Sequence, residues 1–235
     1  MSNLCIITAR GGSKRIPRKN IRPFLGKPII AYSIEAAIQA GVFDEVMVST
    51  DDEDIKSIAI QNGASVPFLR SESTSNDFAT TADVLNEVLD QYEKRGRNFD
   101  YFACVYPTAP FVTGEKLKTA YSILSASDAD SIRTVVQYSY PPQRAFLCNG
   151  GALSYQYPQY YRTRSQDLEP IFHDCGQFYI YRTESFRKYG DAGKMLPLIM
   201  PEEETQDIDN FSDWDFAELK YRQFVLKNSK KLPEA

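Results

Sequence analysis

A glycine-rich loop with a high density of positive charge follows the first apolar segment of the chain. Residues 4–7 are apolar, and TARGGSK follows at residues 8–14. Glycine has no Cβ, so Gly11 and Gly12 allow a tight turn and a close approach to a ligand. Successive main-chain N–H groups in such a turn form a concave set of donors for phosphate, and arginine and lysine add matched charge. The loop therefore predicts a site for a phosphate-bearing ligand.

The distribution of charge along the chain supports the same prediction. Of the 27 lysine and arginine residues, seven lie within the first 34 positions, and all 31 acidic residues come later. The net charge is −4, so the basic stretch stands against an acidic remainder. The alternative is a solvated basic surface or a nucleic-acid-binding arm. The stretch lacks the aromatic stacking platform of a single-strand binder, so no nucleic-acid partner is expected.

A pair of carboxylates late in the chain has the spacing of a divalent-cation site. Asp207 and Asp209 flank Ile208, and in an extended backbone residues i and i+2 point to the same face. Two carboxylates, water and phosphate oxygens are the ligands that magnesium prefers. Loop solvation or capping of the last helix is the alternative, although Ser212 and Asp215 are available as caps. The pair is therefore a candidate for binding Mg²⁺.

Composition and motifs exclude several classes of protein. The single histidine, His173, leaves no two-histidine metal site, and neither a G-x-S-x-G elbow nor a P-loop or dinucleotide glycine pattern is present. Four scattered cysteines without a C-x-x-C pair indicate neither a disulfide framework nor a zinc site. No apolar run reaches the roughly 18 residues of a membrane span. With no signal peptide expected, the sequence predicts a cytoplasmic protein without a membrane partner.

Apolar periodicity and turn residues predict alternating strands and helices. Strands are expected at residues 4–7, 44–50, 65–69, 101–106, 130–137 and 176–181, and helices at residues 28–40, 51–61, 115–125 and 214–225, with others starting near Thr80 and Ser185. The acidic residues 51–54 suit the first turn of a helix. Such alternation predicts a largely parallel sheet covered on both faces. The glycine-rich loop then lies at the carboxyl end of a strand, where α/β sheets bind ligands.

The rhythm changes at residues 138–170, where tyrosine, proline, glutamine and arginine dominate. Asn149-Gly150-Gly151 is typical of a hairpin turn within this stretch. We interpret residues 138–170 as an excursion from a single domain that spans residues 1–235, because a chain of this length forms one α/β domain by default.

One long segment connects these features to a known family. Residues 9–37, ARGGSKRIPRKNIRPFLGKPIIAYSIEAA, resemble the N-terminal signature of the CMP-sugar synthetases, the cytidylyltransferases that activate sialic acids and related nonulosonic acids. The resemblance implies a Rossmann-like three-layer α/β/α sandwich of the nucleotide-diphospho-sugar transferase type, with a mostly parallel sheet and a small dimerisation excursion. It implies that CTP and an acidic nine-carbon sugar react, with Mg²⁺, to a CMP-sugar and pyrophosphate, and that the protein is a homodimer.

The resemblance also assigns roles to residues. Arg10, Lys14 and Lys19 fall on the triphosphate positions of the family, and Asp207 and Asp209 on its magnesium-binding D-x-D. The proton acceptor stays open between Asp209 and a hydroxide on the metal. The residues predicted to contact the substrates are Ala9, Gly11, Gly12, Ser13, Asn20, Arg70, Thr81, Tyr106, Thr108, Arg164, Gln166, Asp167, His173 and Gln177. A lone histidine such as His173 is equally typical of a packed, hydrogen-bonded side chain.

Three departures from the family pattern concern the sugar. Sialic acid enzymes have glutamine where this chain has Tyr106, arginine where it has Val112, and N-G where it has Asp174-Cys175-Gly176. We expect all three to lie at the sugar, so a different nonulosonic acid is predicted. RSQDLEPIFHDCGQFY looks most like the pseudaminic acid cytidylyltransferases. The alternatives are a sialic or legionaminic acid enzyme, a synthetase for the eight-carbon sugar KDO, a hexose-phosphate nucleotidyltransferase, or a non-catalytic nucleotide-binding module.

Overall fold

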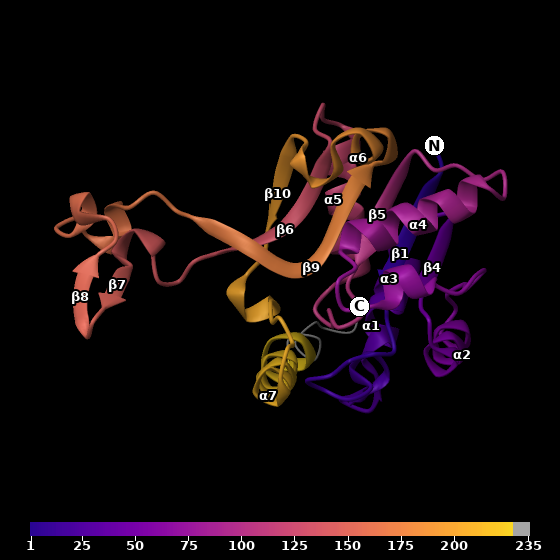
Figure 1. Cartoon of the computed structure of the whole chain (residues 1–235), viewed down its shortest axis with the longest axis horizontal. Helices are drawn as coiled ribbons and strands as arrows, with labels where there is room; N and C mark the ends of the chain where they lie inside the picture. The colour runs from indigo at the N-terminus through magenta and orange to yellow at the C-terminus, as the bar shows by residue number, and fades with distance from the viewer. Residues whose placement is uncertain (228–235) are drawn as a thin grey trace, which may run out of the picture.

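A six-stranded mixed sheet forms the centre of the molecule, and the computed structural model describes residues 1–227. The strand order is β10-β6-β9-β5-β1-β4 (Figure 1). The strands are β1 (Asn3–Thr8), β4 (Glu45–Ser49), β5 (Tyr101–Val105), β6 (Ser131–Gln137), β9 (Phe172–Arg182) and β10 (Met195–Ile199). Only β9 is antiparallel to its neighbours, β5 and β6. The prediction of a mostly parallel sheet is confirmed.

Helices cover both faces of this sheet, as predicted. They are α1 (Ile29–Ala40), α2 (Glu53–Gln61), α3 (Glu72–Ser75), α4 (Thr81–Glu93), α5 (Gly114–Ser125), α6 (Thr183–Tyr189) and α7 (Phe211–Lys220). Apolar residues of α1, α2 and α5 pack against one face, and those of α4 and α6 against the other. Thr80 and Asp83 form the expected capping box of α4, and Asp52 caps α2 by accepting from the N–H of Ile55.

One predicted strand is absent. Residues 65–69 form a single bridge, between Met47 and Ser65, and no strand. Ser65 exchanges hydrogen bonds with Val46 and Val48 of β4, but Pro67 has no N–H to continue the pairing. The sheet therefore ends at β4 on this side. At the opposite edge of the sheet, residues 195–199 form the strand β10, and an edge strand tolerates a proline such as Pro197.

Glu45, at the start of β4, joins three parts of the chain. Its carboxylate accepts hydrogen bonds from Ser65, from the Tyr92 hydroxyl of α4 at 2.6 Å and from Arg97. Burial raises the pKa of Glu45, but these three donors outweigh it and hold the pKa below its ordinary value. The folded pKa thus lies below the pKa that Glu45 has in the unfolded chain. Glu45 therefore contributes stability that is present above that value and lost as the pH falls through the folded pKa.

Glutamine in place of Glu45 should therefore flatten the acid side of the stability profile. We expect E45Q to lower the free energy of unfolding by about 2 kcal/mol at pH 7, because hydrogen bonds to a charged group are lost. The difference between E45Q and the parent should shrink below pH 4.5. Urea unfolding at pH 7, 5 and 3.5 measures this, and a difference that stays constant with pH would contradict it.

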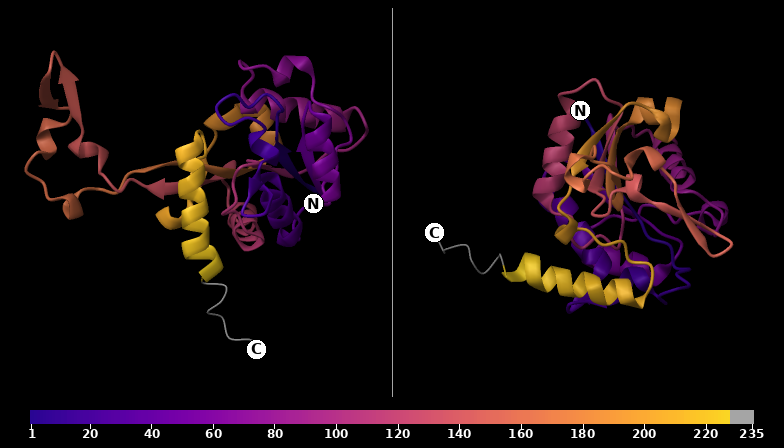
Figure 2. Two further views of the ribbon diagram at one scale, coloured as in Figure 1. Left: turned by 90° about the horizontal axis from the view of Figure 1, so that it is seen from below. Right: turned by 90° about the vertical axis from the view of Figure 1, so that its left-hand side faces the viewer.

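Residues 138–170 form an arm that leaves the body of the molecule between β6 and β9 (Figures 1 and 2). At its far end lies the predicted hairpin, β7 (Phe146–Asn149) and β8 (Ala152–Tyr155), with Gly150 and Gly151 at φ 57° and 81° in the turn. Every residue of both hairpin strands is exposed. Such an arm buries little apolar surface within its own chain.

The basic stretch near the start of the chain packs against the segment around α7. Ile16 and Phe24 from the basic stretch share a buried cluster with Ile208 and Trp214 near α7. The rings of Phe24 and Trp214 meet edge to face at 5.6 Å between centroids. Residues almost 200 positions apart are therefore held side by side by apolar burial. No helix within residues 1–227 has both the length and the hydropathy needed to cross a bilayer.

Candidate active site

A cleft of about 600 Å³ opens at the carboxyl ends of β1 and β5. Thr8, at the end of β1, and Pro107, just after β5, lie on its wall. Its charged lining consists of five basic side chains and three acidic ones, namely Arg10, Lys14, Arg15, Lys19, Arg70, Asp77, Asp207 and Asp209. The size suits a small-molecule ligand, and the excess of positive charge suits an anion.

The structure brings most of the predicted site residues into this cleft, but not all. The predicted residues that line it are Arg10, Ser13, Lys14, Lys19, Asn20, Arg70, Thr81, Tyr106, Thr108, Asp207 and Asp209. The predicted residues outside the lining are Ala9, Gly11, Gly12, Arg164, Gln166, Asp167, His173 and Gln177. Ala9 is fully buried, and its N–H donates to the Ser49 carbonyl of β4. The predicted residues that line the cleft come from segments that are distant in the sequence and meet only in the folded chain.

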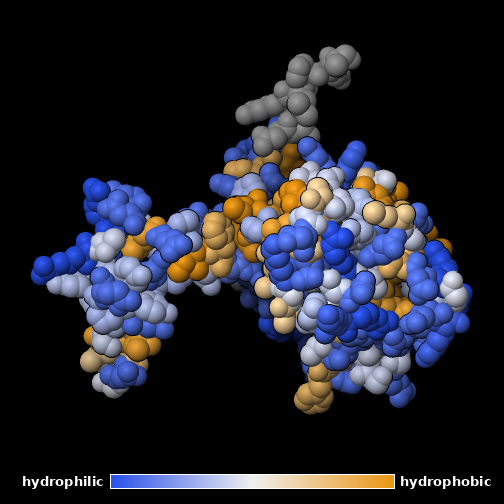
Figure 3. All heavy atoms as spheres, turned by 90° about the horizontal axis from the view of Figure 1, so that it is seen from above, coloured by the Kyte–Doolittle hydropathy of each residue, from blue (hydrophilic) through white to orange (hydrophobic). Residues whose placement is uncertain are grey.

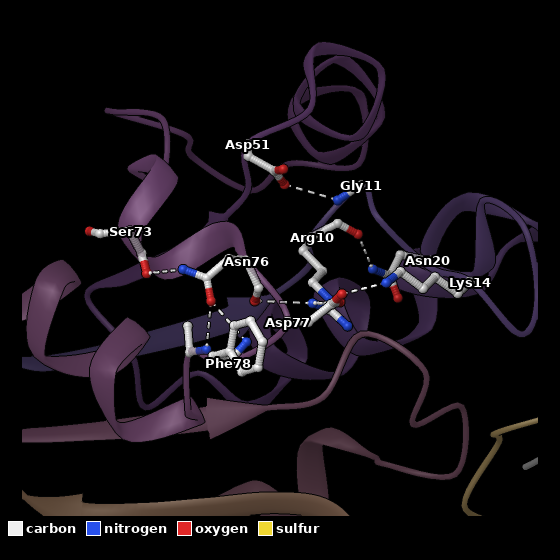
Figure 4. A network of polar contacts seen from close by, with 10 residues as sticks. Arg10, Gly11, Lys14, Asn20, Asp51, Ser73, Asn76, Asp77 and Phe78 are labelled. Atoms are coloured by element: carbon white, nitrogen blue, oxygen red, sulfur yellow. Dashed lines mark hydrogen bonds and ion pairs between the residues drawn. The ribbon is translucent and has the colours of Figure 1, made fainter.

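Two aspartates, Asp51 and Asp52, lie against the glycine-rich loop. The Gly11 N–H donates to the Asp51 carboxylate at 2.9 Å (Figure 4), and the Ser13 N–H donates to the Gly11 carbonyl at 3.0 Å. These two main-chain donors are therefore engaged inside the protein. Neither N–H is therefore free for an anion, whereas the basic side chains of Arg10 and Lys14 line the cleft. Asp52 lies directly under Gly11, in an ion pair with Arg18.

This packing explains the first glycine and gives a matched test. A Cβ on Gly11 would lie 2.7 Å from the Asp52 Oδ2 and 3.0 Å from its Cβ, whereas a Cβ on Gly12 would meet nothing within 4 Å. We expect G11A to displace the loop and weaken CTP binding roughly tenfold, since Asp52 is fixed as the cap of α2. G12A should bind CTP within about twofold of the parent. Calorimetric titration of both variants measures this, and equal effects would contradict it.

Lys19 joins the basic stretch to the aspartate segment. Its Nζ donates to the Ile208 carbonyl at 2.6 Å and lies 3.8 Å from the Asp209 carboxylate. Arg15 makes a closer ion pair with the same carboxylate, at 2.7 Å. Burial lowers the pKa of Lys19, although Asp209 and Asp207 oppose the shift. Cation and carboxylate thus share one wall of the cleft.

Asp207 and Asp209 have the predicted arrangement. Both line the cleft, while Ile208 between them is 1% exposed in the apolar cluster with Trp214. Partial burial and the neighbouring Asp209 raise the pKa of Asp207. Neither aspartate caps α7, because Asn210 and Asp213 form its capping box. The expectation that Ser212 and Asp215 cap this helix is wrong, since Asn210 precedes the first turn.

The donor set at the two aspartates fits a magnesium ion that the nucleotide helps to hold. Within residues 1–227 no three histidine, cysteine, aspartate or glutamate side chains are grouped so as to bind a metal by themselves. Asp207 makes no ion pair with any of the described residues, so its carboxylate is available. Magnesium keeps several waters and takes one or two carboxylates plus phosphate oxygens. Two carboxylates beside a cationic loop fit that requirement.

Arg70 and Thr81 also line the cleft. Arg70 is 9% exposed, and its guanidinium donates through Nε to the Ser49 hydroxyl at 3.0 Å and through Nη2 to the Ser49 carbonyl at 2.7 Å. Burial lowers the pKa of Arg70. Thr81 is the first residue of α4 and lines the cleft together with Tyr106. These rigid groups can orient a heterocyclic base.

Two of the three departures from the family pattern meet beside the cleft. An added Cβ on Gly176 would lie 3.9 Å from both the Tyr106 ring and the Asp207 carboxyl carbon. Asp174 accepts hydrogen bonds from the Tyr179 hydroxyl at 2.9 Å and from the Gly176 N–H at 2.7 Å. The third departure is elsewhere: Val112 is buried in the core with α5. The expectation that Val112 lies at the sugar is therefore wrong, because its side chain fills the interior.

Gln177 supports the site from behind. It is 1% exposed, and its Nε2 donates to the Glu204 carbonyl at 2.7 Å. Thr205 follows Glu204, and its carbonyl accepts a hydrogen bond from the Lys220 Nζ at 2.8 Å. These bonds anchor the segment that leads to Asp207, so Gln177 acts within this chain as a positioning residue.

Four predicted residues lie on or beside the arm, away from the cleft of their own chain. Arg164 and Asp167 pair with each other at 2.7 Å, with Gln166 between them. The His173 Nδ1 contacts the Asp174 carbonyl at 2.9 Å, and its ring lies 4.5 Å from that of Tyr138. Within one chain, His173 is therefore a packed and hydrogen-bonded side chain.

Sequence reasoning overlooked three charged residues of the site. Arg15 pairs with Asp209, Asp51 holds Gly11, and Asp77 pairs with both Arg10 and Lys14. Arg15 was visible within the basic stretch, but nothing in the sequence distinguishes it from Arg18, which points instead to Asp52 and Asp54. Asp77 lies in a polar loop whose path only the fold defines.

A cationic, glycine-hinged loop and two carboxylates at the carboxyl edge of a mostly parallel sheet define an α/β protein of the nucleotide-binding class. A family model described as cytidylyltransferase matches residues 4–196. The chain belongs to the cytidylyltransferase family.

Relatives and solved structures agree with this assignment. The chain is 39% identical to pseudaminic acid cytidylyltransferase of Campylobacter jejuni, over 94% of this chain and 97% of that protein. It is 35% identical to CMP-N,N'-diacetyllegionaminic acid synthase of Legionella pneumophila, over 93% and 95% of the two chains. The structure of CMP:2-keto-3-deoxy-manno-octonic acid synthetase complexed with CTP superposes with a TM-score of 0.71 at 18% identity, over 96% and 100%. That likeness concerns the fold.

Proposed function

We propose that this protein transfers the cytidylyl group of CTP to a nonulosonic acid, pseudaminic acid, and releases pyrophosphate. The observation that carries the proposal is the meeting of Lys19 with Ile208 and Asp209, which unites a phosphate loop and a carboxylate pair in one cleft. The similarity to pseudaminic acid cytidylyltransferase of Campylobacter jejuni over 94% of the chain supports the choice of sugar.

The reaction needs no nucleophile from the protein. The anomeric hydroxyl of the sugar attacks the α-phosphorus in line, and pyrophosphate leaves from the opposite side. Arg10, Lys14 and Lys19 bind the phosphate oxygens and stabilise the charge that develops on them. Asp207 and Asp209 would hold Mg²⁺, which when bound supplies further neutralisation of that charge. Asp209, 3.8 Å from the Lys19 Nζ, is our candidate for the group that accepts the hydroxyl proton.

The nucleotide and the sugar share the cleft in this proposal. Arg70 and Thr81 orient the cytosine, because their donors and acceptors are fixed by β4 and α4. Tyr106 and Thr108 face the sugar, next to Asp174 and Gly176. Asn20 lines the same cleft and donates to the Arg10 carbonyl at 2.9 Å, so it also orients the loop.

Turnover measurements test the proposal directly. Pyrophosphate release should require CTP together with pseudaminic acid, and should be at least roughly tenfold slower with legionaminic, sialic or KDO substrates. UTP, ATP and GTP should support little release. Faster release with another sugar would reassign the substrate, and CTP binding without release under any condition would indicate a non-catalytic nucleotide-binding module.

The proposal includes a homodimer joined through the arm, with the body and arm of residues 1–235 as one domain. Hydrophobic residues gather on the stem and tip of the arm (Figure 3), and its exposed side chains include Tyr140 at 90% and Leu153 at 68%. Patches of this kind mark protein interfaces. Arg164, Gln166 and Asp167 would then face the cleft of the second copy. A cytoplasmic location accords with four free cysteines.

Glutamate in place of Leu153 should therefore separate the subunits. We expect the parent to scatter light as a dimer and L153E as a monomer of about 27 kDa, because a charge would be buried at the interface. I60E is the control, since Ile60 is an exposed apolar residue of α2. A monomeric parent, or a variant that dimerises as well as I60E, would exclude the arm as the interface.

A further inference from the structure

Asp77, a carboxylate of the protein itself, pairs with two of the cations that line the cleft, Arg10 and Lys14. Asp77 accepts a hydrogen bond from Arg10 Nη1 at 3.0 Å through Oδ1 and pairs with the Lys14 ammonium through Oδ2 (Figure 4). Arg10 also donates to the carbonyl of Asn76 at 3.2 Å. Lys14 and Arg10 hold the pKa of Asp77 below its usual value, so the pair is stabilised in its ionised form.

The loop around Asp77 is shaped to present it. The Asn76 side chain accepts from the N–H groups of Phe78 at 2.8 Å and Ala79 at 3.0 Å, and donates to the Ser73 carbonyl at 2.7 Å. This Asx-type turn turns the chain back between α3 and α4. Phe78 is 94% exposed, so it does not anchor the loop. Asp77 is thus held at the cleft by its own turn and by the two cations.

Two carboxylates of the cleft form ion pairs with four of its basic side chains. Arg10 and Lys14 pair with Asp77, and Arg15 and Lys19 pair with Asp209. Four of the five basic side chains of the cleft therefore have a carboxylate partner in the described chain. A triphosphate that takes Arg10 and Lys14 must displace Asp77, because like charges around one pair of cations repel.

We infer that Asp77 is an exchangeable anion that competes with the phosphates for Arg10 and Lys14. This inference rests on the proposed function. Asp77 leaves the cations when CTP binds and returns to them as pyrophosphate departs, so it weakens phosphate binding and assists product release. The alternative, that Asp77 merely arranges Arg10 and Lys14 for the ligand, predicts the opposite sign for its removal.

Asparagine in place of Asp77 distinguishes these alternatives, because they predict opposite changes in phosphate affinity. Calorimetric titration of pyrophosphate, and separately of CTP, into D77N at 50 mM salt should give affinities about threefold to fivefold tighter than the parent. The gain should shrink at 500 mM salt, since screening weakens exposed pairs. In turnover, product inhibition by pyrophosphate should strengthen by the same factor. D128N is the matched control, because Asp128 makes an exposed ion pair with Lys194 away from the cleft.

A double-mutant cycle with Lys14 adds a second measurement. Methionine in place of Lys14 should weaken pyrophosphate binding more in D77N than in the parent, because Lys14 is then free of its competitor. Equal or weaker binding by D77N than by the parent would overturn the inference while leaving the proposed function intact. Failure of the parent itself to bind CTP and pyrophosphate would instead remove the proposed function.

Discussion

Alanine in place of Lys19 should reduce CTP-dependent pyrophosphate release roughly 100- to 1,000-fold, the loss expected when one fixed charge at the transition state is removed. Lys19 has two tasks in the structure. Its ammonium faces the phosphate end of the cleft, and its hydrogen bond of 2.6 Å to the Ile208 carbonyl holds the aspartate segment against the loop. K19A therefore removes a charge and loosens the carboxylates at once.

The two tasks can be separated by measurement. Arginine at position 19 keeps the charge but changes the geometry, so K19R should recover part of the affinity for CTP and little of the turnover. Lys118 is exposed on α5, away from the cleft, and K118A should match the parent. Activity of K19A within threefold of K118A would count against the assignment of Lys19 to the phosphates.

Asparagine in place of Asp209 should have an effect of similar size, roughly 100- to 1,000-fold on pyrophosphate release. Asp209 is the carboxylate that Arg15 and Lys19 both approach, and it is half of the proposed magnesium site. Electron paramagnetic resonance with Mn²⁺ as the probe gives a readout apart from turnover. Mn²⁺ should bind the parent in the presence of CTP and bind D209N at least roughly tenfold more weakly.

Metal-free CTP binding should respond in the opposite direction. In D209N the cations Arg15 and Lys19 lose their carboxylate partner, so CTP without metal should bind at least as tightly as to the parent. D215N is the control, because Asp215 is exposed on α7 and lies outside the cleft. A D209N protein that binds Mn²⁺ like D215N would exclude Asp209 as a ligand.

Local features of the fold were predictable because local chemistry decides them. Thr80 and Asp83 form their capping box since both partners lie within one helical turn. The Gly150-Gly151 turn has the positive φ values that glycine tolerates. Asp207 and Asp209 face one side because the alternation of an extended backbone requires it. The predicted strand at residues 65–69 is wrong for a local reason as well, since Pro67 has no N–H with which to continue the pairing that Ser65 begins with β4.

The sequence by itself determined which residue types were available: a basic, glycine-hinged loop, a pair of carboxylates and the alternation that builds a parallel sheet. Only the tertiary structure decided their partners. Apolar burial of Ile208 and Trp214 against Phe24 brings the aspartates to Lys19. The fold also buries Val112 in the core and leaves the arm outside the body. The same folding places Asp77 on Arg10 and Lys14. Ion pairs between distant segments depend on the path of the chain, and no spacing in the sequence encodes that path.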